Sequence, residues 1–466
     1  MATSIQPTDP LLANLQANIL KGHGRNFAHH LFIRFKNEQI NNAKAWIGLF
    51  AATSITSARQ QLTATEAFKA GLSTDGGTIF TLSLTSKGYD KLGKGFLKPA
   101  SEAFRSSMSG RSNLLNDVPG EWEEGFTGID AFIIVADDDA ATAKAAADKV
   151  LASVSAFAVL LLNQRGNVLK TKSGIGIEHF GYADGISQPL YLSDDIAHQP
   201  STIEWDDATD QKLLLVADPG GDRDDFGSFL VFRKLEQNVK GFRDAEGDNP
   251  PAPGQLPVVK DVDGNDNDEL AGAMIVGRFE NGTPVIKSSV EVVNNPPRQT
   301  NDFNFANDTN ALKCPFHSHI RLMNPRQGDL LAGDVRDHRI TRRGIPYDEV
   351  NRIPEDRITS ISDDLLDKNQ PVKGVGLLFM CYQSSIESQF EILQAFWANK
   401  GQIGPHITGA QDSLIGQGTN PPKTLPAQWG QPLQTAPFSF SGFVKMKGGE
   451  YFFTPSISFL KGLGTQ

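Results

Sequence analysis

Cysteine is scarce in this 466-residue chain, which contains only Cys314 and Cys381. The two residues do not stand at the CxxC spacing of a metal site, and two thiols cannot form the disulfide framework of a small secreted domain. We therefore expect both thiols to be reduced and buried.

Long apolar runs are also lacking. The longest runs, such as residues 156–162, are far below the ~20 residues that a membrane helix needs. Residues 1–20 lack the basic start and apolar centre of a secretion signal. We therefore expect a soluble protein without membrane contact that stays in the cytoplasm.

Positively charged residues are outnumbered: the chain has 44 Lys and Arg residues and 54 Asp and Glu residues, so its net charge is -10. Phosphate backbones are bound by clustered cations, which the sequence does not show, so nucleic acid is not an expected partner. The composition, 39% hydrophobic and 21% charged, is that of a globular protein with a sizeable core. At about 150 residues per domain, the length favours two large compact units.

The first unit is predicted from alternating strand patterns and from helical spacing of apolar residues. Strands are expected at residues 30–35, 78–84, 129–135 and 156–162, and helices at 41–52, 89–97 and 138–153. This order of strands and helices predicts an α+β module over residues 1–172.

Beyond residue 173 the chain is richer in Gly, Asp and Pro, and regular patterns are fewer. The clearest are strands at 228–232, 374–382 and 438–447 and a helix at 389–398. The tracts 241–269, 294–311 and 401–436 are expected to be long loops, serving as access channels or as peripheral insertions. We predict a second α+β unit over residues 173–466.

His319, Asp184 and Arg342 are the candidate functional residues. An imidazole can bind iron, but most histidines do not, and His317 would share a face with His319 on a strand. Asp184 stands in a Gly-flanked turn, where a carboxylate often caps the turn instead of moving protons. Arg342 precedes Arg343, and such pairs are usually solvated, although an inward guanidinium would stabilise an oxyanion. The residues alone leave these alternatives open.

Several motifs resemble those of the dye-decolorising peroxidase family, in particular its longer fungal and bacterial members. They are GYADG at 181–185, CPFHSHIRLMNPR at 314–326, RRGIPY at 342–347, GLLFMCYQ at 376–383 and GGEYFFTPS at 448–456. The resemblance covers most of the chain, in the family's order and spacing. It implies an α+β fold of two ferredoxin-like modules with facing antiparallel sheets, of the dimeric α+β barrel type. It also implies one haem b per chain, held mainly by the second module.

The resemblance assigns a role to each candidate. His319, and not His317, is implied to be the haem iron ligand. Asp184 is implied to move a proton between the two oxygens of H2O2, and Arg342 to stabilise the negative charge that develops. The implied reaction is a haem-dependent peroxidase reaction that reduces H2O2 and oxidises dyes, phenols and other one-electron donors.

Five more residues are predicted to contact the cofactor. Gly181 and Gly185 would let the backbone approach a flat ring, and Arg321 would supply positive charge to the haem propionates. On their strand, Leu377 and Phe379 share one face and would close the distal pocket, with ordinary core packing as the alternative.

Glu391 is predicted to accept a hydrogen bond from the ligand imidazole, and Glu387, one turn earlier, is the alternative acceptor. A surface salt bridge is the alternative to a role beside the imidazole. Tyr347 and Trp397 are hypothetical relays that carry electrons from dyes too bulky to enter a pocket shaped for peroxide. Packing at a domain face is the alternative for both aromatic residues.

The rival function is a haem-binding or haem-handling protein that transfers haem or releases its iron and has only incidental peroxidase activity. Asp184 and Arg342 favour peroxide chemistry, because haem storage needs neither residue. The expected partners are H2O2 and small-molecule or dye reductants, and formation of a homo-oligomer is left open.

Overall fold

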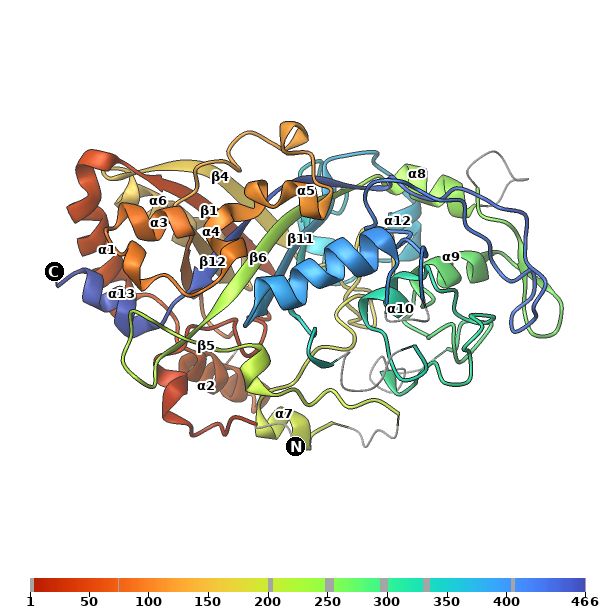
Figure 1. Ribbon diagram of the computed structural model, residues 1–466. Helices are drawn as coiled ribbons and strands as arrows, with labels where there is room; N and C mark the ends of the chain where they lie inside the picture. The colour runs from red at the N-terminus through yellow and green to blue at the C-terminus, as the bar shows by residue number, and fades with distance from the viewer. Residues whose placement is uncertain are drawn as a thin grey trace.

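The computed structural model describes residues 4–73, 75–199, 204–247, 255–293, 301–329, 336–403 and 407–465. Its main feature is a ten-stranded antiparallel sheet (Figure 1). The path through the sheet is β10-β11-β6-β12-β2-β3-β1-β4, while β5 pairs with β6 and β9 pairs with β11. Each half of the chain therefore contributes one end of a continuous sheet.

The N-terminal half contributes β1 (Phe27–Phe35), β2 (Ile79–Leu84), β3 (Ala131–Asp137) and β4 (Ala158–Asn167). Helix α1 (Ile40–Thr53) follows β1 and helix α6 (Ala140–Val154) follows β3, so four predicted strands and two predicted helices are confirmed. The spatial order β4-β1-β3-β2 is the ferredoxin-like one. The predicted helix at 89–97 ends early, at Lys91 of α3 (Ser86–Lys91), because Gly93 has a φ of 69° and leaves the helical region.

The C-terminal half contributes β6 (Phe226–Gln237), β10 (Ile345–Asp348), β11 (Val375–Gln383) and β12 (Val444–Thr454). Strand β12 is predicted at 438–447, but it begins at Val444 and ends at Thr454. It continues past Gly448 because this residue, with a φ of 143°, forms a β-bulge and does not end the strand. The helix expected at 389–398 is confirmed as two consecutive π-helical segments, η8 (Ile386–Phe390) and η9 (Ile392–Ala398).

Part of the sequence expected to be loop is helical. Helices α8 (Val239–Glu246) and α9 (Asp268–Val276) enter the tract 241–269, and residues 294–300 and 404–406 of the other tracts lie outside the described residues. The remaining helices are α2 (Ala58–Lys69), α4 (Glu102–Gly110), α5 (Ser112–Leu115), α7 (Ser193–Ala197), α10 (His319–Met323), α12 (Asp363–Lys368) and α13 (Ile457–Leu463). The remaining strands are β5 (Val216–Ala217), β7 (Val259–Lys260), β8 (Asp266–Asn267) and β9 (Thr341–Arg342).

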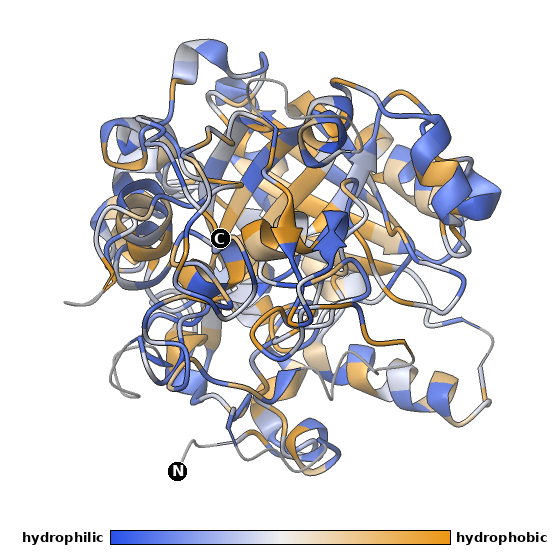
Figure 2. Cartoon of the chain, turned by 90° about the vertical axis from the view of Figure 1, so that its right-hand side faces the viewer, coloured by the Kyte–Doolittle hydropathy of each residue, from blue (hydrophilic) through white to orange (hydrophobic). Residues whose placement is uncertain are grey.

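The two halves of the sheet face one another across an aromatic core. Phe32 and Phe132 of the first half meet Phe232 and Phe452 of the second, with ring centroids 4.8 Å apart for Phe32 and Phe232 and 5.0 Å apart for Phe132 and Phe452. At the far edges, β4 lies against β10. Figure 2 shows the apolar strands surrounded by more polar helices and loops. The predicted α+β fold with facing antiparallel sheets is therefore confirmed.

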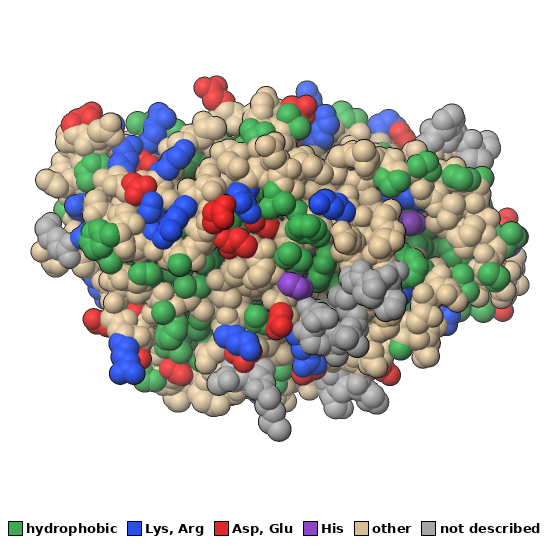
Figure 3. All heavy atoms as spheres, in the orientation of Figure 1, with side chains coloured by type: hydrophobic (Ala, Val, Ile, Leu, Met, Phe, Trp, Pro, Cys, Tyr) green, Lys and Arg blue, Asp and Glu red, His purple; other side chains and the backbone are tan. Residues whose placement is uncertain are grey.

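The predicted division between residues 172 and 173 stays a prediction. Strands β1 to β4 precede that boundary, but α13 at the end of the chain packs on α1 of the first half, where Gly48 and Gly464 approach closely. Across the described part of the chain, no helix combines the length and the apolarity needed to cross a membrane. Figure 3 shows acidic and basic side chains interspersed on one face of the molecule.

Candidate active site

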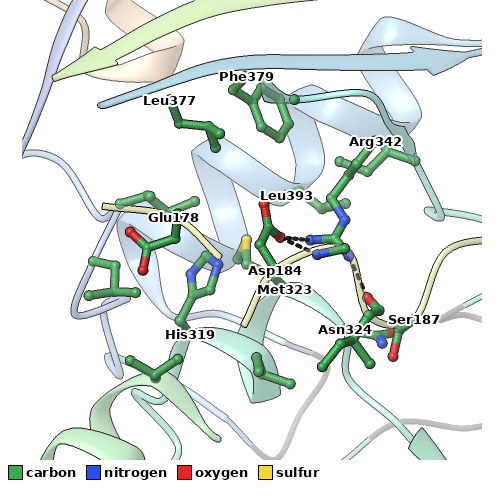
Figure 4. A pocket seen from close by; sticks show the side chains of 18 of the residues that line it. Glu178, Asp184, Ser187, His319, Met323, Asn324, Arg342, Leu377, Phe379 and Leu393 are labelled. Atoms are coloured by element: carbon green, nitrogen blue, oxygen red, sulfur yellow. Dashed lines mark hydrogen bonds and ion pairs between the residues drawn. The ribbon is translucent and has the colours of Figure 1, made fainter. Parts of the chain in front are cut away.

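A cavity of about 320 Å³ lies in the C-terminal half. Its walls come from strands β6 and β11, from the turn that carries Asp184, and from α10 and η9 (Figure 4). His319, Asp184 and Arg342, which are far apart in the sequence, all line this one cavity. The structure therefore brings the three candidate functional residues together.

His319 is the first residue of α10, and its ring is fixed by Asp412. The imidazole Nδ1 lies 2.9 Å from Asp412 Oδ2, and the Asp412 side chain is fully buried. Asp412 also accepts hydrogen bonds from the backbone N–H groups of Leu414 and Ile415. Since Nδ1 is held by the carboxylate, Nε2 is the nitrogen left for a ligand, and no described residue forms a hydrogen bond with it.

The electrostatics of the pair follow from its burial. Burial alone lowers the pKa of His319, but the charge and hydrogen bond of Asp412 outweigh it and raise the pKa above its ordinary value. His317 is different, because its Nδ1 lies 3.1 Å from Ser413 Oγ and its Nε2 lies 3.0 Å from the carbonyl oxygen of Thr424. Both nitrogens of His317 are thus engaged, and it has none left to bind iron.

Asp184 and Arg342 form an ion pair on the cavity wall, with Arg342 Nη1 3.4 Å from Asp184 Oδ1 (Figure 4). Arg342 Nη2 donates to the carbonyl oxygen of Ile186 at 2.6 Å, and the pairing of β9 with β11 fixes the Arg342 backbone. Gly185 has a φ of 82°, and a Cβ atom there would meet no other group within 4 Å. The backbone at Gly185 therefore borders open space, and its contact with a cofactor stays a prediction.

Strand β11 presents two apolar side chains to the cavity. Leu377 and Phe379 both line it. The alternate residues Leu378 and Met380 pack instead in the aromatic core between the two halves of the sheet. This alternation follows from the two-residue period of a strand. The structure thus places the predicted pair on the cavity wall, although Phe379 also packs against the core on the helix side of the sheet.

Two predicted cofactor contacts are wrong. Arg321 is fully buried and does not line the cavity, because its guanidinium is bound by Asp329, at 2.9 and 2.6 Å, and by Asp308 at 3.0 Å. Gly181 does not line the cavity either. It takes a φ of 102° in a turn, and a Cβ atom there would lie 2.5 Å from the guanidinium of Arg243. Both residues are structural.

The predicted acceptors for the imidazole are also wrong. Both Glu391 oxygens accept from the guanidinium of Arg111, at 2.9 and 2.7 Å, and Glu387 accepts from Ser101 and from the backbone of Ala103. Sequence reasoning missed Asp412, which takes the role instead. Asp412 lies within the tract 401–436, whose only signal was an aspartate in a sequence without regular pattern.

Neither predicted relay is a surface residue. Tyr347 is 1% exposed and does not line the cavity, and Lys234 Nζ lies 4.7 Å from its ring centroid. Trp397 is 6% exposed and lines the cavity, with its ring edge-on to half-buried His338 at 5.4 Å. A role of either residue in electron transfer stays a prediction.

Three further arginines that sequence reasoning missed line the cavity. Arg233 is paired with the buried carboxylate of Asp117, and the other two are Arg278 and Arg339. Burial lowers the pKa of Arg278 to about 9, with a contribution from the nearby charge of Arg342, and it lowers the pKa of Arg339 to about 10. Both side chains are therefore still cationic at neutral pH. An anionic group that entered the cavity would be stabilised by them.

Comparison with known proteins identifies the family. No family model matches the chain. The multifunctional dye peroxidase DyP2 of an Amycolatopsis species is 36% identical over 468 residues, which cover 97% of this chain and 96% of the relative. A dye-decolorizing peroxidase of Exidia glandulosa is 32% identical over 75% of this chain and 68% of its own length. The crystal structure of a DyP-type peroxidase from Anabaena superposes with a TM-score of 0.86 at 36% identity, covering 99% of this chain and 97% of that one. The chain therefore belongs to the dye-decolorising peroxidase family.

Proposed function

We propose that this protein binds haem b in the cavity through His319 Nε2 and reduces H2O2 while oxidising dyes, phenols and other one-electron donors. Three features of the cavity fit that cofactor. The imidazole Nε2 is left without a partner in the described chain, the position beside Gly185 is open, and Arg278 and Arg339 supply charge opposite to that of propionates.

Haem, when bound, supplies the iron at which peroxide is reduced and from which oxidising equivalents pass to donors. Asp184 would accept a proton from one oxygen of H2O2 and return it to the other oxygen, which would leave as water. The Arg342 guanidinium stabilises the negative charge that appears as the O–O bond breaks. Asp412 holds the imidazole of His319 in one orientation throughout.

The observation that carries this proposal is the Asp184–Arg342 ion pair in the same cavity as a histidine whose Nδ1 is bound by a buried carboxylate. A protein that only stores haem needs the histidine but not the ion pair. The names of the relatives, which describe peroxidases and dye peroxidases, support the same reaction.

The test is the rate at which H2O2 changes the haem absorption spectrum in Asp184→Asn and Arg342→Leu variants. Loss of a positioned acid–base group is expected to slow this step about 10²- to 10⁴-fold. Asp356→Asn and Arg357→Leu are matched controls, because these residues form an exposed Asp–Arg pair at 3.6 Å. If neither cavity variant slowed the step more than its control, the assignment would be wrong.

Two finer expectations from the sequence remain proposals. They are a cytoplasmic location and the formation of a homo-oligomer. Fractionation of the native host cells and light scattering of the purified protein would decide them.

A further inference from the structure

Tyr451 has surroundings that the proposed peroxide step does not use. It lies on β12 and is 0% exposed, and its hydroxyl donates to Glu391 Oε1 at 3.2 Å. Glu391 is itself 2% exposed and is held by Arg111, whose side chain is partly exposed. The result is a buried phenol hydrogen-bonded to a carboxylate that an arginine fixes in place.

Aromatic rings connect Tyr451 to the cavity. Phe390 lines the cavity, and its ring centroid lies 6.2 Å from that of Tyr451. Phe379, also on the cavity wall, lies 6.2 Å from Phe390. Tyr451 is therefore separated from the cavity by a single packed ring, a short path for an electron through close-packed protein.

A phenol in this position can be oxidised only together with a proton transfer. Burial first, and then the charge of Glu391, raises the pKa of Tyr451 well above its ordinary value, so the side chain is a neutral phenol. Removal of one electron makes that phenol strongly acidic, and a buried cation without a proton acceptor is costly. Glu391 provides the acceptor at hydrogen-bond distance.

Two other buried tyrosines lack one of these conditions. The hydroxyl of Tyr347 has no hydrogen-bond partner in the described chain, and the ammonium of Lys234 over its ring opposes loss of an electron. Tyr182 donates to Glu246 at 2.5 Å, but burial raises the pKa of Glu246 to about 8. At neutral pH Glu246 is therefore largely protonated and is a poor acceptor.

We infer that Tyr451 is a redox-active residue that shares the oxidising equivalents of the reaction. In this step, which rests on the proposed function, the peroxide-oxidised cofactor takes one electron from Tyr451, and the phenolic proton passes to Glu391. The products are a neutral tyrosyl radical, a protonated Glu391 and a cofactor reduced by one electron. Because Tyr451 is 0% exposed, an external one-electron donor does not contact it. The electron of a donor at the cavity reaches the radical through the packed rings of Phe379 and Phe390, and the proton returns from Glu391 to the phenolate oxygen.

The experiment is freeze-quench electron paramagnetic resonance of the haem-loaded protein mixed with H2O2 in the absence of a donor. The protein is made with ring-deuterated tyrosine, which narrows a tyrosyl signal and so identifies it. Tyr451→Phe keeps the ring and its packing but removes the hydroxyl, and it should lose more than half of the tyrosyl spins. Tyr191→Phe is the matched control and should lose none, because Tyr191 is equally buried and its hydroxyl bonds to Thr341 and not to a carboxylate.

Glu391→Gln tests the proton step separately, because a glutamine oxygen can accept the hydrogen bond but is not a base. Radical formation should be slower in this variant than in wild type. A full tyrosyl signal in Tyr451→Phe, with a haem spectrum that still responds to peroxide, would overturn this inference and leave the proposed function standing. A wild-type haem spectrum that peroxide does not change would overturn the proposed function and this inference with it.

Discussion

The imidazole of His319 and the carboxylate of Asp412 are 93 residues apart in the chain and 2.9 Å apart in the fold. A buried anion at Nδ1 makes the opposite nitrogen a stronger donor to a metal, and it fixes the plane of the ring. Burial alone would raise the pKa of Asp412, but the charge and hydrogen bond of His319, together with the backbone N–H groups of Leu414 and Ile415, hold it below its ordinary value. This pairing makes His319 suited to bind iron.

Replacement of Asp412 by asparagine should weaken haem binding about 10- to 100-fold and make the reduction potential of the iron more positive. The reason is that a neutral amide makes the imidazole a weaker electron donor, and the oxidised iron loses more stabilisation than the reduced iron. Haem loss to an apoprotein acceptor and a redox titration measure the two effects.

Glu387→Gln is the control, because Glu387 bonds to Ser101 and Ala103 and not to the imidazole. Its potential should equal that of wild type. A shift as large in Glu387→Gln as in Asp412→Asn would mean that Asp412 has no special link to the iron.

The residues alone left the roles of His319, Asp184 and Arg342 open, and the resemblance of the surrounding motifs to the family assigned them. The structure brings the three side chains to one cavity. Asp412 could not be predicted, since the carboxylate that reaches the ring depends on which loop folds over α10. Arg321 failed as a cofactor contact for a related reason. A guanidinium forms its bonds with the nearest carboxylates, and Asp308 and Asp329 are supplied by tertiary packing.

Helix α10 is a five-residue segment, too short to be stable alone, so its position must come from tertiary contacts. Arg321 provides them, since its guanidinium binds two buried carboxylates and the carbonyl oxygens of Asp308 and Cys314. Rings of Phe305 and Phe316 lie 4.4 and 4.7 Å from the guanidinium carbon. The arginine predicted to touch the cofactor instead anchors the helix that carries His319.

Asp308→Asn should destabilise the protein by about 3 kcal/mol, because it leaves part of a buried positive charge uncompensated while Asp329 remains. Chemical denaturation followed by fluorescence measures the change. Asp148→Asn is the control, since Asp148 pairs with Lys144 at 2.6 Å on the exposed face of α6 and such pairs contribute little. Equal losses in the two variants would contradict an anchoring role for the buried network.

Regular elements were predictable where periodicity was unbroken, as in β1, β3 and α6. Strand β12 was misplaced because Gly448 and Gly449 are read as a strand end, whereas the bulge at Gly448 lets pairing with β6 continue to Thr454. Closure of the sheet at β12 and β2 joins residues more than 350 positions apart at Phe453 and Leu84, and no local pattern contains that information. That feature was available only through resemblance to the family.

The stability of the whole molecule depends on pH, because the pKa of a buried carboxyl group differs between the folded and the unfolded chain. Glu450 is buried beside α4, where it accepts from the backbone N–H groups of Met108 and Tyr451. Burial raises its pKa from 4.5 to about 7. The folded state therefore binds the proton more tightly than the unfolded chain, and this stabilisation is complete below pH 4.5 and lost as the pH rises through about 7.

Glu450→Gln should remove this dependence, because the amide keeps the acceptor oxygen and never ionises. The wild type should lose up to about 3 kcal/mol of stability relative to the variant between about pH 5 and about pH 8. Thermal midpoints of both proteins across that range test the sign and the size. A wild-type curve parallel to that of Glu450→Gln would show that Glu450 does not titrate in this window.

The central claim is that one cavity holds iron on His319 and handles peroxide with Asp184 and Arg342. A crystal structure of the haem-loaded protein tests it most directly. The account predicts iron bonded to His319 Nε2, with Asp184 and Arg342 on the opposite side of the porphyrin. Iron bonded to any other side chain, or a porphyrin outside this cavity, would contradict it.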